Sequence, residues 1–180
     1  MPLRIVLELT DKDLRLLRKE MKRAQAISRE KSELEVIQAA DEVLESAKKR
    51  EVPEFIAKHL ETLQHLIGML TDRQWLLPDK ERNRVRTALL YFANPEDIIQ
   101  DDVPVIGFLD DAIMIELIER ELRHEIDAYR DFCEFRAKGG KAKKPDDGVL
   151  AKRRTQLHER MRRRRRTGRS KGGGSPVGFF

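Results

Sequence analysis

Apolar residues recur three or four positions apart along most of the chain, which predicts amphipathic helices. A first helix follows Thr10, which is expected to act as its N-cap. A second begins near Ser32, Pro53 opens a third, and Asp79 is expected to cap a fourth that runs to about Ala93. The apolar faces of these helices hold Leu14, Leu17, Met21 and Ala24; Val36, Ala40, Val43 and Ala47; Ile56, Leu60, Leu63, Ile67 and Leu70; and Val85, Ala88, Leu89 and Phe92.

The longest predicted helix covers roughly residues 109–138, because one apolar stripe continues through it without a glycine or proline. Trp75 lies in the connector before the fourth helix and is expected to fill the core. The sequence therefore predicts an all-α fold, a compact bundle of about five helices. The stripe of the longest helix is Ile115, Ile118, Leu122, Ile126, Tyr129 and Cys133.

The N-terminal segment has a different period. Apolar residues alternate over residues 3–9, which is typical of a half-buried strand, yet no second strand pattern exists to pair with it. We therefore expect an extended segment that lies on the helices as an arm. The alternative is an edge that pairs with a second copy of the chain.

The run "GGKAKKPDDG", residues 139–148, interrupts both the helical pattern and the composition. It predicts a domain boundary, with a helical domain over 1–138 and a basic tail over 139–180. We expect that tail to be disordered or partly helical. It includes a "GGGS" linker, and the final "PVGFF" is expected to fray rather than to anchor in a protein groove.

Composition favours a soluble protein in a reducing compartment. Charged residues make up 38% of the 180 residues, and the single cysteine, Cys133, excludes an intramolecular disulfide. No apolar stretch reaches the roughly 20 residues that cross a bilayer, and the N-terminus lacks the apolar core of a secretory signal. We expect a cytoplasmic protein.

Charge is divided unevenly along the chain. Residues 138–180 hold 15 Lys and Arg against 3 acids, net +12, whereas the rest hold 22 against 29, net −7. Arginine forks match phosphate oxygens, so the tail is expected to bind RNA, DNA or ribosome phosphates and to become helical as it does so. The predicted contacts are Lys152, Arg153, Arg154, Arg160, Arg162, Arg163, Arg164, Arg165, Arg166, Arg169 and Lys171.

Three other interpretations of the tail stay open: a solubilising tail, attachment to an anionic membrane surface, and docking on the acidic body of the chain itself. The helical core would then bind a protein partner or a second copy. Leu157 and Met161, four positions apart, would supply the apolar side of a helix in the tail.

The stretch "PEDIIQDDVPVIGFLDDA", residues 95–112, is the strongest candidate for chemistry because five aspartates crowd into it. Its spacing is unlike a calcium loop, which needs ligands at alternate positions. Asp97, Asp101 and Asp110 are therefore expected to cap helix starts, with Pro95, Pro104 and Gly107 setting the bends. Ion or ligand binding that also uses Asp111 is the alternative, and it would make a metal-dependent enzyme the third functional candidate.

Enzymatic motifs are otherwise missing from the sequence. Glu121 and His124 have the spacing of one half of a di-iron motif, but the other half is absent. Cys133 lies on an apolar stripe, where a buried inert thiol is expected. There is no glycine-rich phosphate loop and no nucleophile elbow, so we predict a non-enzymatic protein with no cofactor and no bound metal.

The same aspartate stretch resembles the signature of the YkvA-like bacterial family, a domain of unknown function. The family pattern, a tyrosine followed by Pro-x-Asp-x-Ile-Pro-Asp and Pro-x-x-Gly-x-x-Asp-Asp, is matched within residues 91–112. Gln100 replaces one proline of that pattern. The resemblance extends over about residues 88–135 and implies a small helical bacterial domain without an established activity. The matching residues are Tyr91, Pro95, Asp97, Ile99, Asp101, Pro104, Gly107, Asp110 and Asp111.

Overall fold

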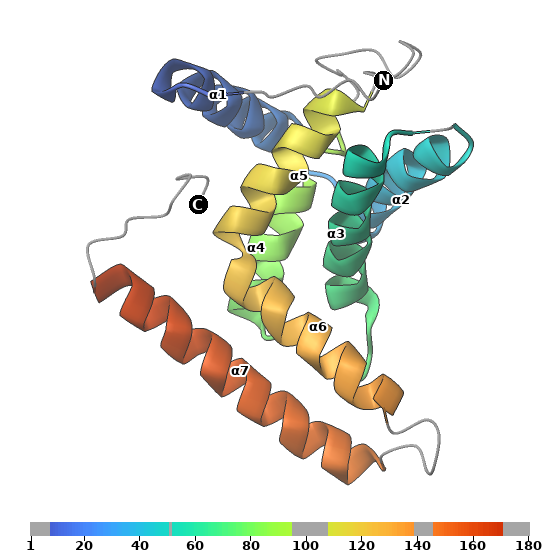
Figure 1. The fold of residues 1–180 in the computed structure, drawn as a ribbon, viewed down its shortest axis with the longest axis vertical. Helices are drawn as coiled ribbons and strands as arrows, with labels where there is room; N and C mark the ends of the chain where they lie inside the picture. Colours follow the sequence, from blue (N-terminus) through green and yellow to red (C-terminus); the bar gives the residue numbers. More distant parts are fainter. Residues whose placement is uncertain (1–7, 51, 95–107, 139–145, 171–180) are drawn as a thin grey trace, which may run out of the picture.

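The computed structural model describes residues 8–50, 52–94, 108–138 and 146–170. Every element in these ranges is a helix, which confirms the all-α class (Figure 1). There are seven of them, more than the predicted five, because the longest predicted helix is divided and the basic tail contributes one. They are α1 (Asp11–Ser28), α2 (Glu33–Lys48), α3 (Glu54–Thr71), α4 (Asp79–Leu89), α5 (Leu109–Glu121), α6 (Arg123–Lys138) and α7 (Asp147–Ser170).

Side-chain caps fix two of the helix starts; the cap at Thr10 was predicted, and the second helix begins beside Ser32 as expected. The Thr10 hydroxyl accepts from the N–H of Asp13, whose carboxylate accepts from the N–H of Thr10. Ser32 and Glu35 form the same reciprocal pair at α2. Such a pair satisfies amides that would otherwise lack acceptors, and it stabilises a helix by about 1 kcal/mol.

The fourth start was predicted wrongly. Pro78 occupies the N-cap position of α4 and Asp79 is the first helical residue, with no side-chain cap bond. Proline fits there because it has already lost the N–H that a helix start leaves unpaired. The helix also ends earlier than expected, at Leu89, and tighter turns continue to Asn94.

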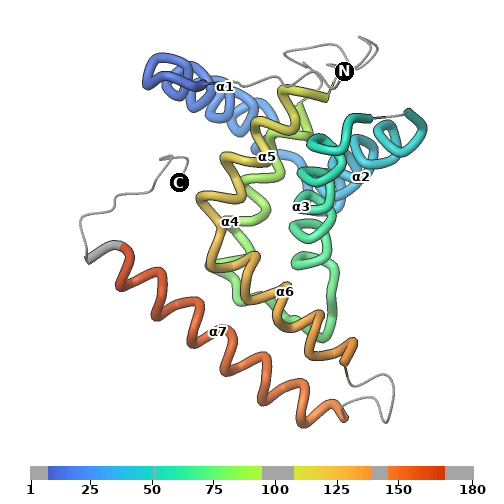
Figure 2. The backbone as a smooth tube through the Cα atoms, viewed as in Figure 1, coloured from blue at the N-terminus to red at the C-terminus, as the bar shows by residue number. Residues whose placement is uncertain are grey.

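The predicted helix over 109–138 is interrupted at Leu122, and Figure 2 shows the change of direction between α5 and α6. Leu122 has φ −102° and ψ 17°, outside the helical range, while its N–H still donates to Ile118. Arg84 of α4 donates to the carbonyl of Glu121 at 3.4 Å. A side chain that takes a backbone carbonyl is a recognised cause of a kink, which explains the break without glycine or proline.

Helix α3 lies at the centre and packs against α2, α4, α5 and α6. Trp75, in the connector between α3 and α4, is fully buried as predicted. Its indole contacts the rings of Tyr129 and Phe132 of α6, with centroids 5.5 and 5.1 Å away. Leu76, the next residue, has φ 47° and an exposed side chain, so the chain can bury both Trp75 and Leu77 around it.

Helix α1 is less embedded than the others and projects from the bundle in Figure 1. Only Met21, Ala24 and Ser28 of this helix are buried. Leu16 and Ile27 are exposed, at 58% and 50%. Of the extended segment predicted over residues 3–9, only Glu8 and Leu9 fall within the described residues.

Candidate functional site

Helix α7 contains most of the predicted phosphate contacts, and it is docked along α6 (Figure 1). Leu150, Leu157 and Met161 are at most 4% exposed and belong to the same hydrophobic core as the bundle. The tail is thus helical over 147–170 and folded against its own chain. Contacts of this kind describe packing rather than independent folding, so the division at residue 138 stays a prediction.

The arginines on the inner side of α7 form ion pairs with buried carboxylates. Glu81 of α4 and Glu125 of α6 are 1% and 0% exposed. Arg165 Nη1 lies 3.1 Å from Glu125 Oε1 and 3.4 Å from Glu81 Oε1. Arg162 reaches Glu81 Oε2 at 3.6 Å. We call the Glu81–Glu125 pair the carboxylate socket.

Arg84 of α4 completes the charge balance around the socket. It pairs with Glu125 and lies 3.6 Å from Glu121. Oε2 of Glu81 and Oε2 of Glu125 accept no hydrogen bond from the residues described. Two buried carboxylates lose more hydration energy than one arginine restores, so several arginines must converge on them.

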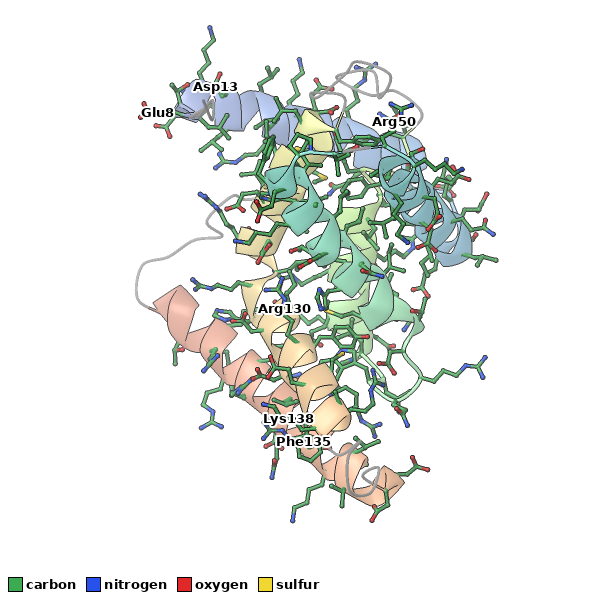
Figure 3. All side chains as sticks on the ribbon, turned by 45° about the vertical axis from the view of Figure 1, so that its right-hand side comes forward. Glu8, Asp13, Arg50, Arg130, Phe135 and Lys138 are labelled. Atoms are coloured by element: carbon green, nitrogen blue, oxygen red, sulfur yellow. The ribbon has the colours of Figure 1, made fainter. Side chains whose placement is uncertain are left out.

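Three further contacts hold α7 against the rest of the chain. Arg160 pairs with Asp131 of α6, and Arg154 Nη1 donates to the carbonyl of Gln74 at 2.9 Å. The Arg153 guanidinium lies 5.5 Å from the ring centre of Phe135, which Figure 3 labels near the end of α6. Five of the predicted phosphate contacts, counting Arg162 and Arg165, therefore bind within the chain.

His158 joins α7 to the connector. Its ring meets the indole of Trp75 edge-on, with centroids 4.4 Å apart. Burial, together with the positive charges of Arg162 and Arg154, lowers the pKa of His158 to about 4. The ring is consequently neutral at physiological pH and packs as an aromatic residue.

The outer side of α7 has a different character. Lys152, Arg163, Arg164 and Arg166 are exposed, and they make no ion pair with any residue in the described ranges. Arg162 adds a side chain that is 51% exposed. We call Arg162, Arg163, Arg164 and Arg166 the arginine cluster. Lys171 lies outside the described residues, and the side chain of Arg169 is not described.

The aspartate stretch is only partly described. Pro95, Asp97, Asp101, Pro104 and Gly107 fall on residues 95–107 and lie outside the described ranges. Asp110 and Asp111 are in the first turn of α5 and are 5% and 8% exposed. Phe108, not Asp110, occupies the N-cap position, so the cap prediction for Asp110 was wrong. Both carboxylates still face the positive end of the helix.

The described side chains do not form a metal-binding cluster. Among the described side chains, no three His, Cys, Asp or Glu residues converge as metal ligands would. Glu121 is beside Arg84, and burial, with the nearby charge of Arg123, lowers the pKa of His124. Cys133 is half-buried beside Arg136.

Glu81 and Glu125 were missed by sequence reasoning. Each is an acid on a charged helix, a pattern that normally indicates an exposed face. The only local signal is their position beside apolar neighbours, such as Ile126 after Glu125. Their partners on α7, Arg162 and Arg165, lie at least 40 residues further along the chain.

These contacts define a class: an all-helical protein whose basic last helix is docked on buried carboxylates of its own bundle. Residues 87–117 match the family described as "Protein of unknown function (DUF1232)". The "Uncharacterized membrane protein YkvA" of Bacillus subtilis (strain 168) is 36% identical over 63 residues, 32% of this chain and 59% of that protein. The matches confirm the resemblance: the chain contains a YkvA-like domain of unknown function.

The chain thus spans 59% of the relative's length. No solved structure matches the chain at a significant level. The family and the relative are described without an enzymatic activity. Within the described ranges, no helix has both the length and the apolar character needed to cross a bilayer.

Proposed function

We propose that this protein is a non-enzymatic cytoplasmic protein that binds RNA or DNA phosphates through the arginine cluster. The observation that supports the proposal is the division of α7 into two sides. Its inner arginines are bound to Glu81, Glu125 and Asp131, whereas Arg163, Arg164 and Arg166 of the cluster are exposed, and Arg162 is half-exposed beside Glu81. A docked helix presents these side chains in fixed positions, which lowers the entropic cost of binding.

The number of free arginines sets the expected strength. The cluster spans residues 162–166, about 6 Å along a helix axis, so it meets only a few neighbouring phosphates. Neutralising three to four phosphates gives a slope of about −3 to −4 in log K against log salt. If α7 undocked and all eleven predicted side chains bound phosphates, the slope of log K against log salt would be nearer −10.

Sequence preference is expected to be weak. Residues 147–170 contain no Phe, Tyr or Trp that could stack on a base. Contacts to phosphates position a protein but carry no sequence information. RNA and DNA of unrelated sequence should therefore bind with similar affinity.

The test is fluorescence anisotropy with a labelled RNA and a labelled duplex across a salt series. Arg163→Gln with Arg166→Gln removes two charges and should reduce the slope by about 2. Lys48→Gln with Lys138→Gln is the matched control, because both lysines are exposed and lie on other helices. Binding that lacks salt dependence, or that the control weakens equally, contradicts the proposal.

A second candidate is attachment of the same cluster to anionic membrane lipid. The word "membrane" in the printed name of the Bacillus relative favours it. Clustered arginines gain roughly 1 kcal/mol each near an acidic leaflet. Sedimentation of one protein sample with anionic vesicles, and with the labelled RNA as competitor, separates the two candidates.

The helical core is proposed to bind a protein partner or a second copy through α1. Exposed Leu16 and Ile27 are eleven positions apart and therefore share one helical face. Leu16→Glu should then lower the molar mass measured by light scattering, or abolish capture of a partner, without changing the helix content. An unchanged mass and unchanged capture would contradict a role for this face.

A further inference from the structure

A second candidate site lies along α5 and shares no residue with the carboxylate socket. A cavity of about 440 Å³ opens between the beginning of α1, α3 and α5. This volume falls within the range of about 300–1,000 Å³ that small-molecule sites occupy. The cavity shares no residue with the arginine cluster, so it requires an explanation of its own.

The walls are mainly apolar. Leu14, Ile113 and Leu117 line the cavity, together with Phe55 and Leu9. Phe55 is 49% exposed and Leu9 is 40% exposed, although both are among the larger apolar side chains. Apolar surface of this kind favours an apolar occupant, since burial from water is worth roughly a fourfold gain in affinity per methylene.

A hydrogen-bonded row of three polar side chains, His59, Glu116 and Arg120, lines the polar side of the cavity. His59 Nε2 lies 3.1 Å from Glu116 Oε2, and Arg120 Nε donates to Glu116 Oε1 at 2.8 Å. His59 Nδ1 lies 2.6 Å from the carbonyl oxygen of Phe55. The ring of His59 is thereby held between the Phe55 carbonyl and the Glu116 carboxylate.

The Arg120 guanidinium is the group in this row that can bind an anion. Burial opposes ionisation of Glu116, but hydrogen bonds from Arg120 and His59 outweigh it and lower the pKa of the carboxyl. Arg120 uses Nε for Glu116, so its two terminal nitrogens form a fork without a partner among the described residues. Such a fork fits a carboxylate or a phosphate.

We propose that this cavity binds a single-chain amphiphile with an acidic headgroup, its hydrocarbon chain against Phe55 and Ile113 and its headgroup on Arg120. The source is either a free fatty acid or the acyl chain and headgroup of an anionic lipid. The shared chemistry is the same in both cases. The proposal does not depend on nucleic-acid binding by α7.

The test uses calorimetric titration of the full chain with octanoate, decanoate and dodecanoate, each below its aggregation concentration. Affinity is expected to rise roughly fourfold per methylene until the cavity is filled. Decanol, with the same chain as decanoate and no charge, should bind about fivefold to tenfold more weakly. Affinity that ignores chain length, or decanol that binds as well as decanoate, overturns the proposal.

Two variants test the residues. Arg120→Gln, at a 63% exposed side chain, should weaken decanoate about fivefold to tenfold and leave decanol unchanged. Ile113→Trp should fill the cavity and abolish binding of both. Lys138→Gln is the control, because Lys138 forms an equivalent i,i+4 pair with Glu134 on α6. Equal loss in the control, or no loss in Arg120→Gln, overturns the assignment.

Anionic vesicles identify the source. If Ile113→Trp also abolishes vesicle sedimentation, the occupant comes from a membrane lipid. If the protein binds decanoate and ignores vesicles, the occupant is a free amphiphile. Both results support the site. Vesicle binding that survives Ile113→Trp and Arg120→Gln, with no binding of decanoate, overturns it.

Discussion

Arg165 Nη1 lies 3.1 Å from Oε1 of Glu125, a carboxylate with no exposed surface. The pair joins α7 to α6 across 40 residues of sequence. It gives Arg165 a structural role within a five-arginine run, while Arg164 and Arg166 beside it are exposed. The two roles can be separated by substitution.

Arg165→Met should lower the free energy of unfolding by about 2–3 kcal/mol, because it leaves Glu125 and Glu81 short of a buried partner. The loss is below that of a fully buried pair, since Arg84 still holds Glu125. Arg166→Met, one position along and exposed, should change stability by no more than about 0.5 kcal/mol. Urea unfolding measures both, and equal effects would refute the socket.

Gly68→Ala should destabilise the protein by about 1–2 kcal/mol, although alanine is normally the better helix former. A Cβ at Gly68 would lie 2.8 Å from the Tyr129 hydroxyl oxygen and 3.2 Å from a ring carbon. Tyr129 has little room to move, because it packs on Trp75 and donates to Asp72.

Tyr129→Phe provides the second half of this test. It removes the oxygen nearest to the added Cβ, so the double variant should be more stable than the two single losses predict, by at least about 0.5 kcal/mol. Thermal melts of the four proteins give the coupling. Strict additivity would show that the clash is absent.

Leu76→Gly should stabilise the chain by somewhat less than about 1 kcal/mol. The left-handed backbone at Leu76 costs a leucine about 1–2 kcal/mol, and glycine recovers most of it while losing some chain entropy. Little packing is lost, because the side chain is 57% exposed. Arg73→Gly, in the same connector but without a positive φ, should instead destabilise. Chemical denaturation would reveal a wrong sign in either variant.

His158 should make stability fall as the pH falls from about 6.5 toward 4. Burial lowers the pKa of His158 to about 4 in the folded chain, whereas the unfolded chain takes up a proton near 6.5. The unfolded state therefore binds more protons in this window, so acidification favours unfolding. Because the ring is only half-buried, we expect a loss of about 1–2 kcal/mol.

His158→Phe keeps the ring against Trp75 and removes the titration. Unfolding free energies at pH 7.5 and pH 4.5 should therefore differ less in this variant than in the parent chain. Carboxylates titrate in both proteins, so the comparison isolates the histidine. An identical pH dependence in the two proteins would show that folding does not lower the pKa of His158.

Local features were predictable where the chemistry is local. Thr10 and Ser32 carry capping side chains with an acid three residues later, and that pattern does not depend on the rest of the fold. The apolar stripes identified most of the buried positions for the same reason, although Leu14, Leu17 and Val43 are only partly buried. The core position of Trp75 was also predictable, since a lone tryptophan between helices has few other places to go.

Features that depend on distant partners were not predictable. The stripe through Leu122 looks continuous, and only Arg84, from another helix, shows why the backbone breaks there. The pattern of Arg162 and Arg165 would be the same on a free tail and on a docked helix. The deciding residues, Glu81 and Glu125, read as ordinary surface acids until the helices are assembled.

Trp75 is the single tryptophan of the chain, and its indole rests against His158 of α7. Indole emission depends strongly on its surroundings, so the fluorescence of the unmodified protein reports whether α7 is in place. If the spectrum stays constant when RNA, lipid or an amphiphile binds, α7 remains docked in the complex. A red shift means that α7 has separated from Trp75, so that the inner arginines can also bind the ligand.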